Sequence, residues 1–394
     1  MPAFSYEVVI VGGLGHVGLP LGIALANTGM KVSLYDIDPK KIELVKKGQM
    51  PFVEKDAPEQ LKKALKNNLF ITSDRSVVAK GKFIIISLGT PVDEHLNPEI
   101  EHFTGFFSEI LEYLSDDQHI VIRSTVFPGT TEKLAQYLHS NGKKTNVSFC
   151  PERIAEGKAI EELKLLPQIV SGVNEASCQE AKQLFSSLTN EIIVLRTTEA
   201  ELAKLITNSW RYLLFAISNQ FYEIATQNGL DFYKIYDAVT YNYPRLGAFP
   251  KAGFAAGPCL FKDTMQLAAY SNNSFFLGHA AMLINEGLPN FIVQQLLAKE
   301  NLSEMVVGIL GMAFKADIDD PRESLSYKLA KILSREAKQV LCTDPYVDDP
   351  SLVDLKEVLS KSDLIIIGAS HSVYKGLDLS SVKVFDMWGN RRLK

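Results

Sequence analysis

The chain has 394 residues, more than one ordinary hydrophobic core accommodates, so two or three domains are expected. Apolar residues make up 46% and charged residues 22%, a balance typical of a folded globular protein. The net charge of -5 argues against a nucleic-acid partner, which would favour a basic surface. Apolar runs are too short to span a bilayer, and the N-terminus lacks the features of a secretory signal. We therefore expect a cytoplasmic protein without a membrane partner.

The four cysteines are widely separated in the sequence and form no C-x-x-C pair. They are Cys150, Cys178, Cys259 and Cys342. This spacing disfavours a disulfide framework and a structural zinc site. We expect free thiols and no bound metal.

The first part of the chain, residues 1–198, alternates strand and helix signals. The expected strands lie at 7–11, 31–35, 83–87 and 120–123, and the expected helices at 19–27 and 39–47. These strands are apolar without polar alternation, which indicates a parallel sheet covered on both faces. We expect a domain of that kind here.

The middle part, residues 199–300, changes to helical spacing. Apolar residues recur with a helical period over 199–228, which is long for a globular helix, and more helix is expected over 264–299. A helix this apolar needs a partner, either another domain or a second subunit. We expect a central helical domain and at least a homodimer.

The last part, residues 301–394, returns to the first pattern, with expected strands at 306–310, 340–343 and 364–368 and a helix at 324–334. The sequence LYDIDP that ends the second strand of the first part is echoed by LCTDPY at the corresponding strand of the last. The predicted fold class is α/β, with two Rossmann-like, doubly wound parallel-sheet domains joined by a long central helix.

A G-x-G-x-x-G motif follows the first expected strand and opens the first expected helix, at Gly13, Gly15 and Gly18. In this context the glycines permit a tight turn, the approach of a pyrophosphate, and close packing of helix on strand. Asp36 ends the second strand, where a carboxylate accepts hydrogen bonds from ribose hydroxyls and repels a 2′-phosphate. The motif therefore predicts NAD rather than NADP. A turn with no ligand is the alternative reading. The last domain lacks the full motif, so we expect it to hold a different ligand.

The stretch 257–263, GPCLFKD, places a cysteine after a stiff turn and next to charged residues. The chain is expected to be helical from Thr264, which puts Cys259 near a helix N-terminus, where the thiolate is favoured. The alternative is an inert structural cysteine in a turn.

Four polar residues share one face of the long central helix: Glu201, Lys204, Asn208 and Arg211. We expect Glu201 and Arg211 to be solvated. Lys204 and Asn208 suit the stabilisation of an oxyanion, because a helix this apolar should have little solvent-exposed face.

These features combine in a family resemblance that covers essentially the whole chain. The chain resembles the nucleotide-sugar 6-dehydrogenases that act on UDP-glucose, UDP-N-acetylhexosamines and GDP-mannose. The motifs that carry the resemblance are GGLGHVGLP at 12–20, GTPVD at 89–93, RSTVFPGTT at 123–131, PERIAEG at 151–157, AKLITNSW at 203–210, GPCLFKD at 257–263 and GMAFKADIDDPRES at 311–324.

The resemblance implies roles for individual residues. It makes Cys259 the nucleophile and Lys204, Asn208 and Asp263 the polar groups around it, with Thr125 and Glu152 positioning water and substrate. The implied NAD site comprises Gly13, Gly15, His16, Val17, Gly18, Asp36, Thr90, Thr125 and Arg322. The implied UDP-sugar site comprises Glu152, Arg153, Lys204, Asn208, Arg245, Phe249, Gly257, Phe314 and Lys315, with Arg245 reaching the substrate of a neighbouring subunit.

The implied reaction is the NAD-dependent, four-electron oxidation of a C6 primary alcohol to a uronic acid, through a thiohemiacetal and a thioester on Cys259. The segment 284–293 favours a UDP-N-acetylhexosamine, whereas Ala256–Cys259 departs from the G-G-S-C of many members and leaves the sugar open. UDP-glucose and GDP-mannose remain alternatives. A two-electron dehydrogenase of the 3-hydroxyacid type would need neither Cys259 nor a second α/β domain. A regulatory protein that senses NAD would not need the intact catalytic residues.

Overall fold

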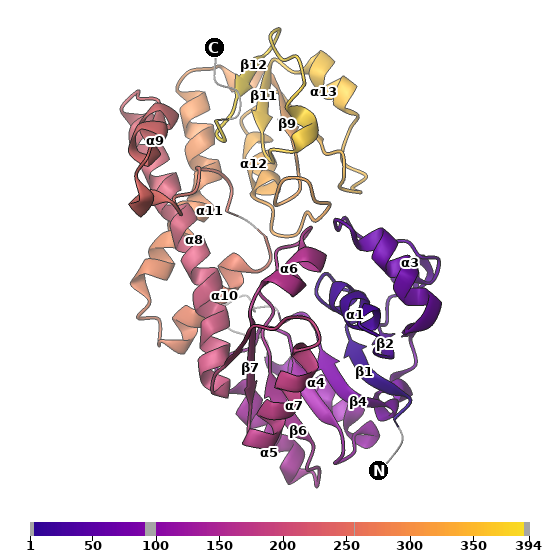
Figure 1. Ribbon diagram of the computed structural model, residues 1–394. Helices are drawn as coiled ribbons and strands as arrows, with labels where there is room; N and C mark the ends of the chain where they lie inside the picture. The colour runs from indigo at the N-terminus through magenta and orange to yellow at the C-terminus, as the bar shows by residue number, and fades with distance from the viewer. Residues whose placement is uncertain (1–3, 91–99, 256, 390–394) are drawn as a thin grey trace. The chain divides into compact units, whose positions relative to one another are not determined.

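The computed structural model describes residues 4–90, 100–255 and 257–389 (Figure 1). The chain forms two compact units, one ending at Thr207 and the other beginning at Asn208. None of the helices in the described ranges is long and apolar enough to cross a membrane.

The first unit is built on an eight-stranded sheet with the order β3-β2-β1-β4-β5-β6-β7-β8. Its strands are β1 (Tyr6–Val11), β2 (Val32–Tyr35), β3 (Leu69–Thr72), β4 (Gly81–Ile86), β5 (His119–Ile122), β6 (Asn146–Phe149), β7 (Gln168–Gly172) and β8 (Ile192–Val194). All neighbours pair in parallel except β6 and β7, which are antiparallel. The doubly wound prediction is confirmed, with this one reversal added to it.

Both faces of this sheet are covered, which explains the unbroken apolar strands. Val8 and Ile10 of β1 pack into one hydrophobic core, and Val9 and Val11 pack into a second core on the opposite face. The helices of this unit are α1 (Gly18–Asn27), α2 (Pro39–Lys46), α3 (Ala57–Asn67), α4 (Ile100–Ile110), α5 (Thr130–Ser140), α6 (Ala159–Leu165) and α7 (Glu175–Phe185). Helices α1, α3, α6 and α7 pack into the first core, whereas α4 and α5 pack into the second.

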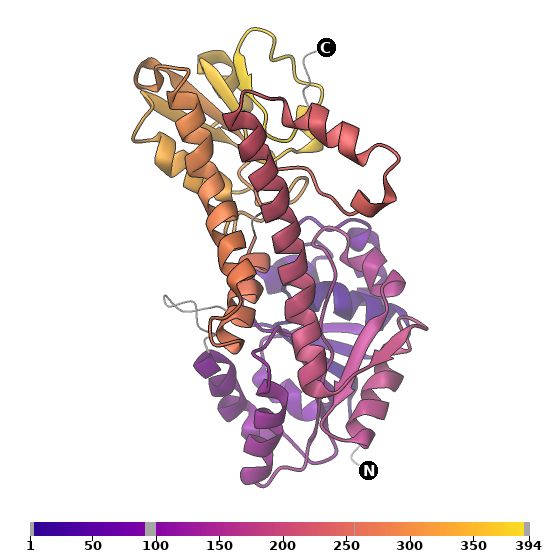
Figure 2. The ribbon, with the colours of Figure 1, turned by 90° about the vertical axis from the view of Figure 1, so that its left-hand side faces the viewer.

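The long central helix is α8 (Thr197–Gln227), and it is continuous over 31 residues (Figure 2). The boundary between the two units falls inside it. Arg211 is exposed as expected, but the prediction of a solvated Glu201 is wrong, because its side chain is fully buried. The Glu201 carboxylate accepts hydrogen bonds from Gly129 N at 2.6 Å, Thr131 N at 2.9 Å and the Thr131 hydroxyl at 2.6 Å. It thereby caps the N-terminus of α5 and fixes α8 to the chain that follows β5.

The second unit contains the rest of α8 with α9 (Phe232–Thr240), α10 (Leu260–Tyr270) and α11 (Phe276–Leu297). The helix expected over 264–299 is present, but as two helices rather than one. Helix α10 begins at Leu260 and ends before Asn272 and Asn273, whose left-handed φ values of 51° and 59° break the helix. Buried amides join α8 to α11, since Asn285 donates to Tyr212 O at 3.0 Å and accepts from Asn219 at 2.9 Å.

A second, four-stranded parallel sheet has the order β10-β9-β11-β12. Its strands are β9 (Val306–Leu310), β10 (Gln339–Thr343), β11 (Leu364–Ile367) and β12 (Lys383–Phe385), with helices α12 (Leu325–Leu333) and α13 (Leu355–Lys361). Gly311 has a φ of 93° at the turn after β9, and a Cβ there would lie 2.4 Å from Ala369 O. The chain after β9 therefore passes very close to the chain after β11.

We expect Glu201→Ala to lower the free energy of unfolding by about 3 kcal/mol, because it leaves buried N–H groups of α5 without acceptors. Glu199→Ala is the matched control on the same helix, since Glu199 forms an ion pair with the exposed Arg196. It should leave stability almost unchanged. Urea unfolding measures both variants, and equal midpoints would contradict a capping role for Glu201.

Candidate active site

The glycine motif lies in the turn between β1 and α1, and its three glycines meet different surroundings. A Cβ on Gly13 would lie 2.8 Å from the Leu34 side chain, and one on Gly18 would lie 2.4 Å from Gly12 O. A Cβ on Gly15 would meet only Gly12 O, at 3.5 Å. Gly13 and Gly18 are thus required by packing, while Gly15 leaves one side of the turn open. Such an opening at a helix N-terminus fits a dinucleotide pyrophosphate.

Asp36 lies immediately after β2 and is half-buried. Its Oδ2 accepts from Leu14 N at 2.9 Å, and its Oδ1 accepts from Asp38 N at 3.1 Å. The same carboxylate therefore organises the glycine turn. Its place at the carboxyl end of β2 fits the predicted role at a ribose.

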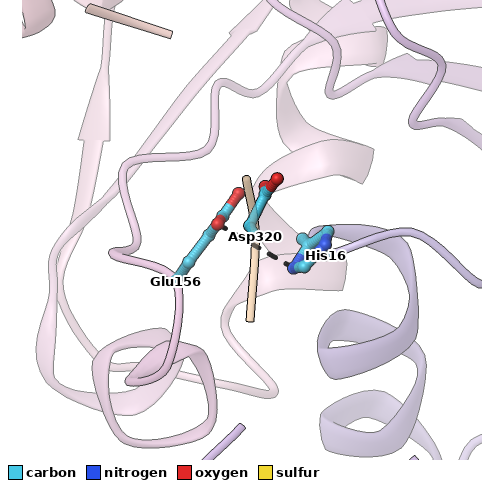
Figure 3. Close-up of side chains that lie close together, drawn as sticks. All are labelled: His16, Glu156 and Asp320. Atoms are coloured by element: carbon cyan, nitrogen blue, oxygen red, sulfur yellow. Dashed lines mark ion pairs between the residues drawn. The ribbon is translucent and has the colours of Figure 1, made fainter. Parts of the chain in front are cut away.

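His16 and Val17 complete the predicted pyrophosphate turn. Val17 is the N-cap of α1, and the His16 ring stacks on Phe52 with 4.1 Å between ring centroids. His16 Nδ1 lies 3.9 Å from Glu156 Oε2 (Figure 3). Glu156 is not among the site residues predicted from the sequence. Its place in the PERIAEG motif is the signal that could have identified it.

Glu152 is buried and paired with Arg123, whose guanidinium is fully buried. Glu152 Oε1 also accepts from Arg153 N at 2.7 Å and Ile154 N at 3.0 Å. Arg123 stacks on Phe185 and donates to Cys150 O at 2.9 Å. Both oxygens of Glu152 are therefore held by protein donors, which favours a positioning role.

The half-buried Arg153 guanidinium donates to Pro167 O. Desolvation by burial lowers the pKa of Arg153, and the nearby Glu152 carboxylate opposes that shift. Glu54, which the sequence analysis also missed, accepts from Gly157 N at 3.0 Å and Ala159 N at 2.7 Å. Hydrogen bonds thus hold the loop that carries Glu152 and Glu156 at several points along its length.

Thr90 and Thr125 follow the adjacent strands β4 and β5, and the structure brings them together. The Thr90 hydroxyl donates to Thr125 O at 2.5 Å. The last residues of the GTPVD motif, 91–93, lie outside the described residues. At the carboxyl edge of a parallel sheet, these two threonines fit the predicted cofactor site.

Cys259 is the N-cap of α10, and its side chain is exposed. The four cysteines form no disulfide, and of the other three, Cys150 and Cys178 are buried and Cys342 is half-buried. Burial raises the pKa of the Cys150 thiol to about 12 and of the Cys342 thiol to about 11, so they remain protonated and unreactive. Cys259 is the accessible thiol, and it lies where the α10 dipole favours a thiolate.

One turn along α10, Asp263 donates its backbone N–H to Cys259 O at 2.9 Å. The buried Asp263 carboxylate accepts from the Asn208 amide at 2.6 Å and lies 3.4 Å from Lys262 Nζ. This bond fixes Asn208 of α8 against α10. Lys204 lies one helical turn before Asn208 and is half-buried, so the two polar groups share a face of α8.

Gly257 lies in the loop that precedes Cys259, here called the cysteine loop, and contacts the segment that follows β9. Its φ is 102°, and a Cβ there would lie 2.6 Å from the Phe314 ring. Gly257 N also donates to Glu323 O at 3.4 Å. Two predicted substrate residues, Gly257 and Phe314, are therefore in direct contact.

The remaining predicted residues of the second unit lie on its loops. Arg245 is exposed and lies over the Tyr243 ring, 5.8 Å from its centroid. Phe249 packs on Tyr236 with 5.1 Å between ring centroids. Lys315 is half-buried, and Arg322, which is exposed, pairs with Asp320.

Two sheets with a long helix between them in the chain, the first sheet parallel except for one strand pair, and a glycine turn open to a pyrophosphate define an NAD-dependent dehydrogenase. More particularly, the chain belongs to the UDP-glucose/GDP-mannose dehydrogenase family. The models of its NAD binding domain, central domain and UDP binding domain match residues 7–189, 198–286 and 308–389.

Named relatives extend over almost the whole chain. The UDP-N-acetyl-D-mannosamine dehydrogenase of Pyrococcus horikoshii is 30% identical, covering 95% of this chain and 92% of its own. That of Escherichia coli is 24% identical, covering 96% and 97%. Among solved structures, the Pyrococcus horikoshii enzyme has a TM-score of 0.90 at 28% identity, covering 98% and 96%. A UDP-glucose dehydrogenase from Pyrobaculum islandicum has a TM-score of 0.88 at 26% identity, covering 100% and 96%.

Asp36→Asn should raise the KM for NAD about tenfold and narrow the preference for NAD over NADP. It removes the charge that repels a 2′-phosphate while keeping an oxygen that accepts from the glycine turn. Glu43→Gln is the matched control, because it makes the same change of charge at an exposed position on α2. Steady-state kinetics with both cofactors test this prediction, and an unchanged ratio of kcat/KM values would remove Asp36 from the ribose site.

Proposed function

We propose that this enzyme oxidises the C6 primary alcohol of UDP-N-acetyl-D-mannosamine to a carboxylate. The relatives from Pyrococcus horikoshii and Escherichia coli are named for that substrate, and segment 284–293 favours an N-acetylhexosamine. The observation that carries the proposal is the exposed Cys259 thiol, one helical turn from the Asn208–Asp263 pair. The neighbour from Pyrobaculum islandicum makes UDP-glucose the second candidate.

Two NAD molecules, bound one after the other, would supply the hydride acceptors for the two rounds of oxidation at the sugar C6. In the glycine turn, Gly15 leaves room for the pyrophosphate and Asp36 takes the ribose hydroxyls. Thr90 and Thr125 fix the carboxyl ends of β4 and β5 beside it. Arg322 completes this site in the proposal, as the family resemblance implies.

Cys259 acts between the two rounds. The first oxidation turns the alcohol into an aldehyde, which has no hydride to give until a nucleophile adds to it. The Cys259 thiolate forms a bond to C6, and the carbonyl oxygen becomes an oxyanion that Lys204 and Asn208 stabilise by hydrogen bonds. Loss of the second hydride leaves a thioester.

Water then attacks the thioester, the C–S bond breaks, and the thiolate leaves with the electron pair. Thr125 and Glu152 position this water and the sugar. The ion pair of Glu152 with Arg123 and its bonds to two backbone N–H groups support that role, because they hold the carboxylate in one place.

The nucleotide end of the substrate is assigned to the other predicted residues of the site. Phe314 and Lys315 lie in the segment that follows β9, within the match to the UDP binding domain. Arg153, Phe249 and Gly257 complete the proposed contacts.

We also propose a homodimer that uses the apolar face of α8. Trp210, Ile217, Phe221 and Ile224 are all between 45% and 57% exposed, and their spacing places them along one face. They line a groove of about 570 Å³ that Arg245 and other residues complete. A patch of this kind favours a protein interface, and a twofold axis would let Arg245 of each subunit serve the site of the other.

Cys259→Ser should stop turnover and accumulate a covalent ester with the sugar nucleotide, because an oxygen ester hydrolyses more slowly than a thioester. Cys259→Ala should still allow some first hydride transfer but form no carboxylate. The wild type should form two NADH per sugar, and a panel that includes UDP-N-acetyl-D-mannosamine and UDP-glucose identifies the substrate.

Intact-protein mass spectrometry detects the ester, and NADH absorbance gives the stoichiometry. Cys178→Ser provides the control, since it makes the same exchange at a buried cysteine of α7. Carboxylate formation at the normal rate by Cys259→Ala would overturn the covalent route. One NADH per substrate would favour the two-electron class instead.

Phe221→Glu should convert the dimer into a monomer, because it places a charge in the centre of the apolar face. The KM for the sugar nucleotide should rise at least tenfold as Arg245 of the second subunit is lost. Leu165→Glu, at another exposed apolar residue, should leave the dimer intact. Sedimentation velocity measures the assembly, and a fully active wild-type monomer would contradict this proposal.

A further inference from the structure

The two units repeat one structural device. In the first, β1 lies between β2 and β4, and in the second, β9 lies between β10 and β11. Asp36 follows β2, and Asp344 follows β10. Each carboxylate accepts from the backbone of the turn after the middle strand, Asp36 from Leu14 N and Asp344 from Met312 N and Ala313 N at 2.7 and 2.9 Å. Asp344 therefore corresponds in position to Asp36, the proposed ribose ligand of the first unit.

The surroundings of the two carboxylates differ. Asp36 is half-buried, whereas the side chain of Asp344 is fully buried. Besides the two bonds from the turn, Asp344 accepts from Tyr346 N at 2.8 Å, Val347 N at 3.1 Å and His371 Nε2 at 2.9 Å. Burial opposes its ionisation, but the bond from His371 and those from the backbone outweigh it and lower the pKa to about 2. A ribose has no access to this carboxylate.

His371 reaches the Asp344 carboxylate from the chain that follows β11. It follows β11 by the same number of residues by which Thr90 follows β4. Its side chain is fully buried, with the Tyr346 and Tyr374 rings packed edge-on against it. Its Nδ1 accepts from Asp317 N at 2.8 Å, so the tautomer assigned by these bonds carries its proton on Nε2 and donates it to Asp344.

These bonds hold the segment that carries Phe314 and Lys315. At one end, Asp344 fixes the backbone of Met312 and Ala313, and at the other, His371 fixes Asp317 N. Asp317 has a left-handed φ of 59°, and its Oδ1 accepts from Ser372 N at 2.7 Å and the Ser372 hydroxyl at 2.9 Å. The constraint extends to the cysteine loop, because the Phe314 ring contacts Gly257.

We propose that His371 is a positioning residue for the sugar nucleotide. Bound to Asp344, it holds Asp317 N and thereby places Phe314 and Lys315 against the substrate and keeps the Phe314 ring in contact with Gly257 of the cysteine loop. This inference rests on the proposed substrate site in the last domain. It also explains how that domain keeps the strand order of the cofactor half although its Asp344 carboxylate is closed to a ribose.

Two substitutions separate the two hydrogen bonds of His371. His371→Asn keeps an acceptor at the δ position for Asp317 N, whereas His371→Gln keeps a donor at the ε position for Asp344. If His371 acts by positioning Asp317, the His371→Gln variant should bind UDP about tenfold more weakly than the wild type. Its KM for the sugar nucleotide should rise by a similar factor, with a smaller change in kcat. Asn should stay within about threefold of the wild type. The affinity for NAD should not change.

Isothermal titration of the full-length protein with UDP and, separately, with NAD provides the readout. Asp317→Gly is a further variant in case the buried substitutions fail to fold, because glycine accepts the left-handed φ and only the exposed carboxylate is lost. It should weaken UDP binding severalfold.

Normal UDP affinity in His371→Gln or Asp317→Gly would overturn the inference, and so would equal losses for UDP and NAD. A wild-type protein that binds no UDP would instead overturn the proposed function.

Discussion

Hydrogen bonds from backbone N–H groups to carboxylates are the constraint on which the site depends. Parallel strands end at one edge of a sheet, and the loops that leave this edge expose N–H groups that no strand pairs. Asp36, Glu54, Glu152, Glu201 and Asp344 each accept from such groups. The loops are thereby held without secondary structure of their own, and their other side chains keep fixed directions.

The same constraint has an electrostatic cost that differs between positions. Burial raises the pKa of Glu201, and the bonds from Thr131 and Gly129 counteract only part of this effect. At Asp344 the balance is reversed and the carboxylate stays ionised. The difference follows from the donors, because Asp344 has five, including a histidine, whereas Glu201 has three. A buried carboxylate thus serves as a fixed anchor where enough donors converge on it.

The sequence predicts the strands and helices of this fold closely wherever local patterns are strong. Strand β9 and the start of α2 at Pro39 lie where they were expected, and Cys259 lies at a helix N-terminus as predicted. The features that the sequence did not predict depend on contacts between residues that are distant in the sequence. From its helical spacing alone, Glu201 is predicted to be solvated, and only the packing of α5 against α8 buries it. The break between α10 and α11 depends on two asparagines, a residue type that also occurs within helices. His371 carries no motif, and its role appears only when β10 and β11 lie on either side of β9.

The position of α8 in both compact units has a consequence for folding. A helix propagates cooperatively, because each added residue extends an existing hydrogen-bonded turn. The turns that hold Glu201 in the first unit are therefore continuous with those that hold Asn208 and Asn219 in the second. Unfolding of either unit would therefore disrupt the turns of α8 against which the other unit packs. The chain is thus organised to lose both units in a single transition rather than one domain at a time, although each has its own sheet and core.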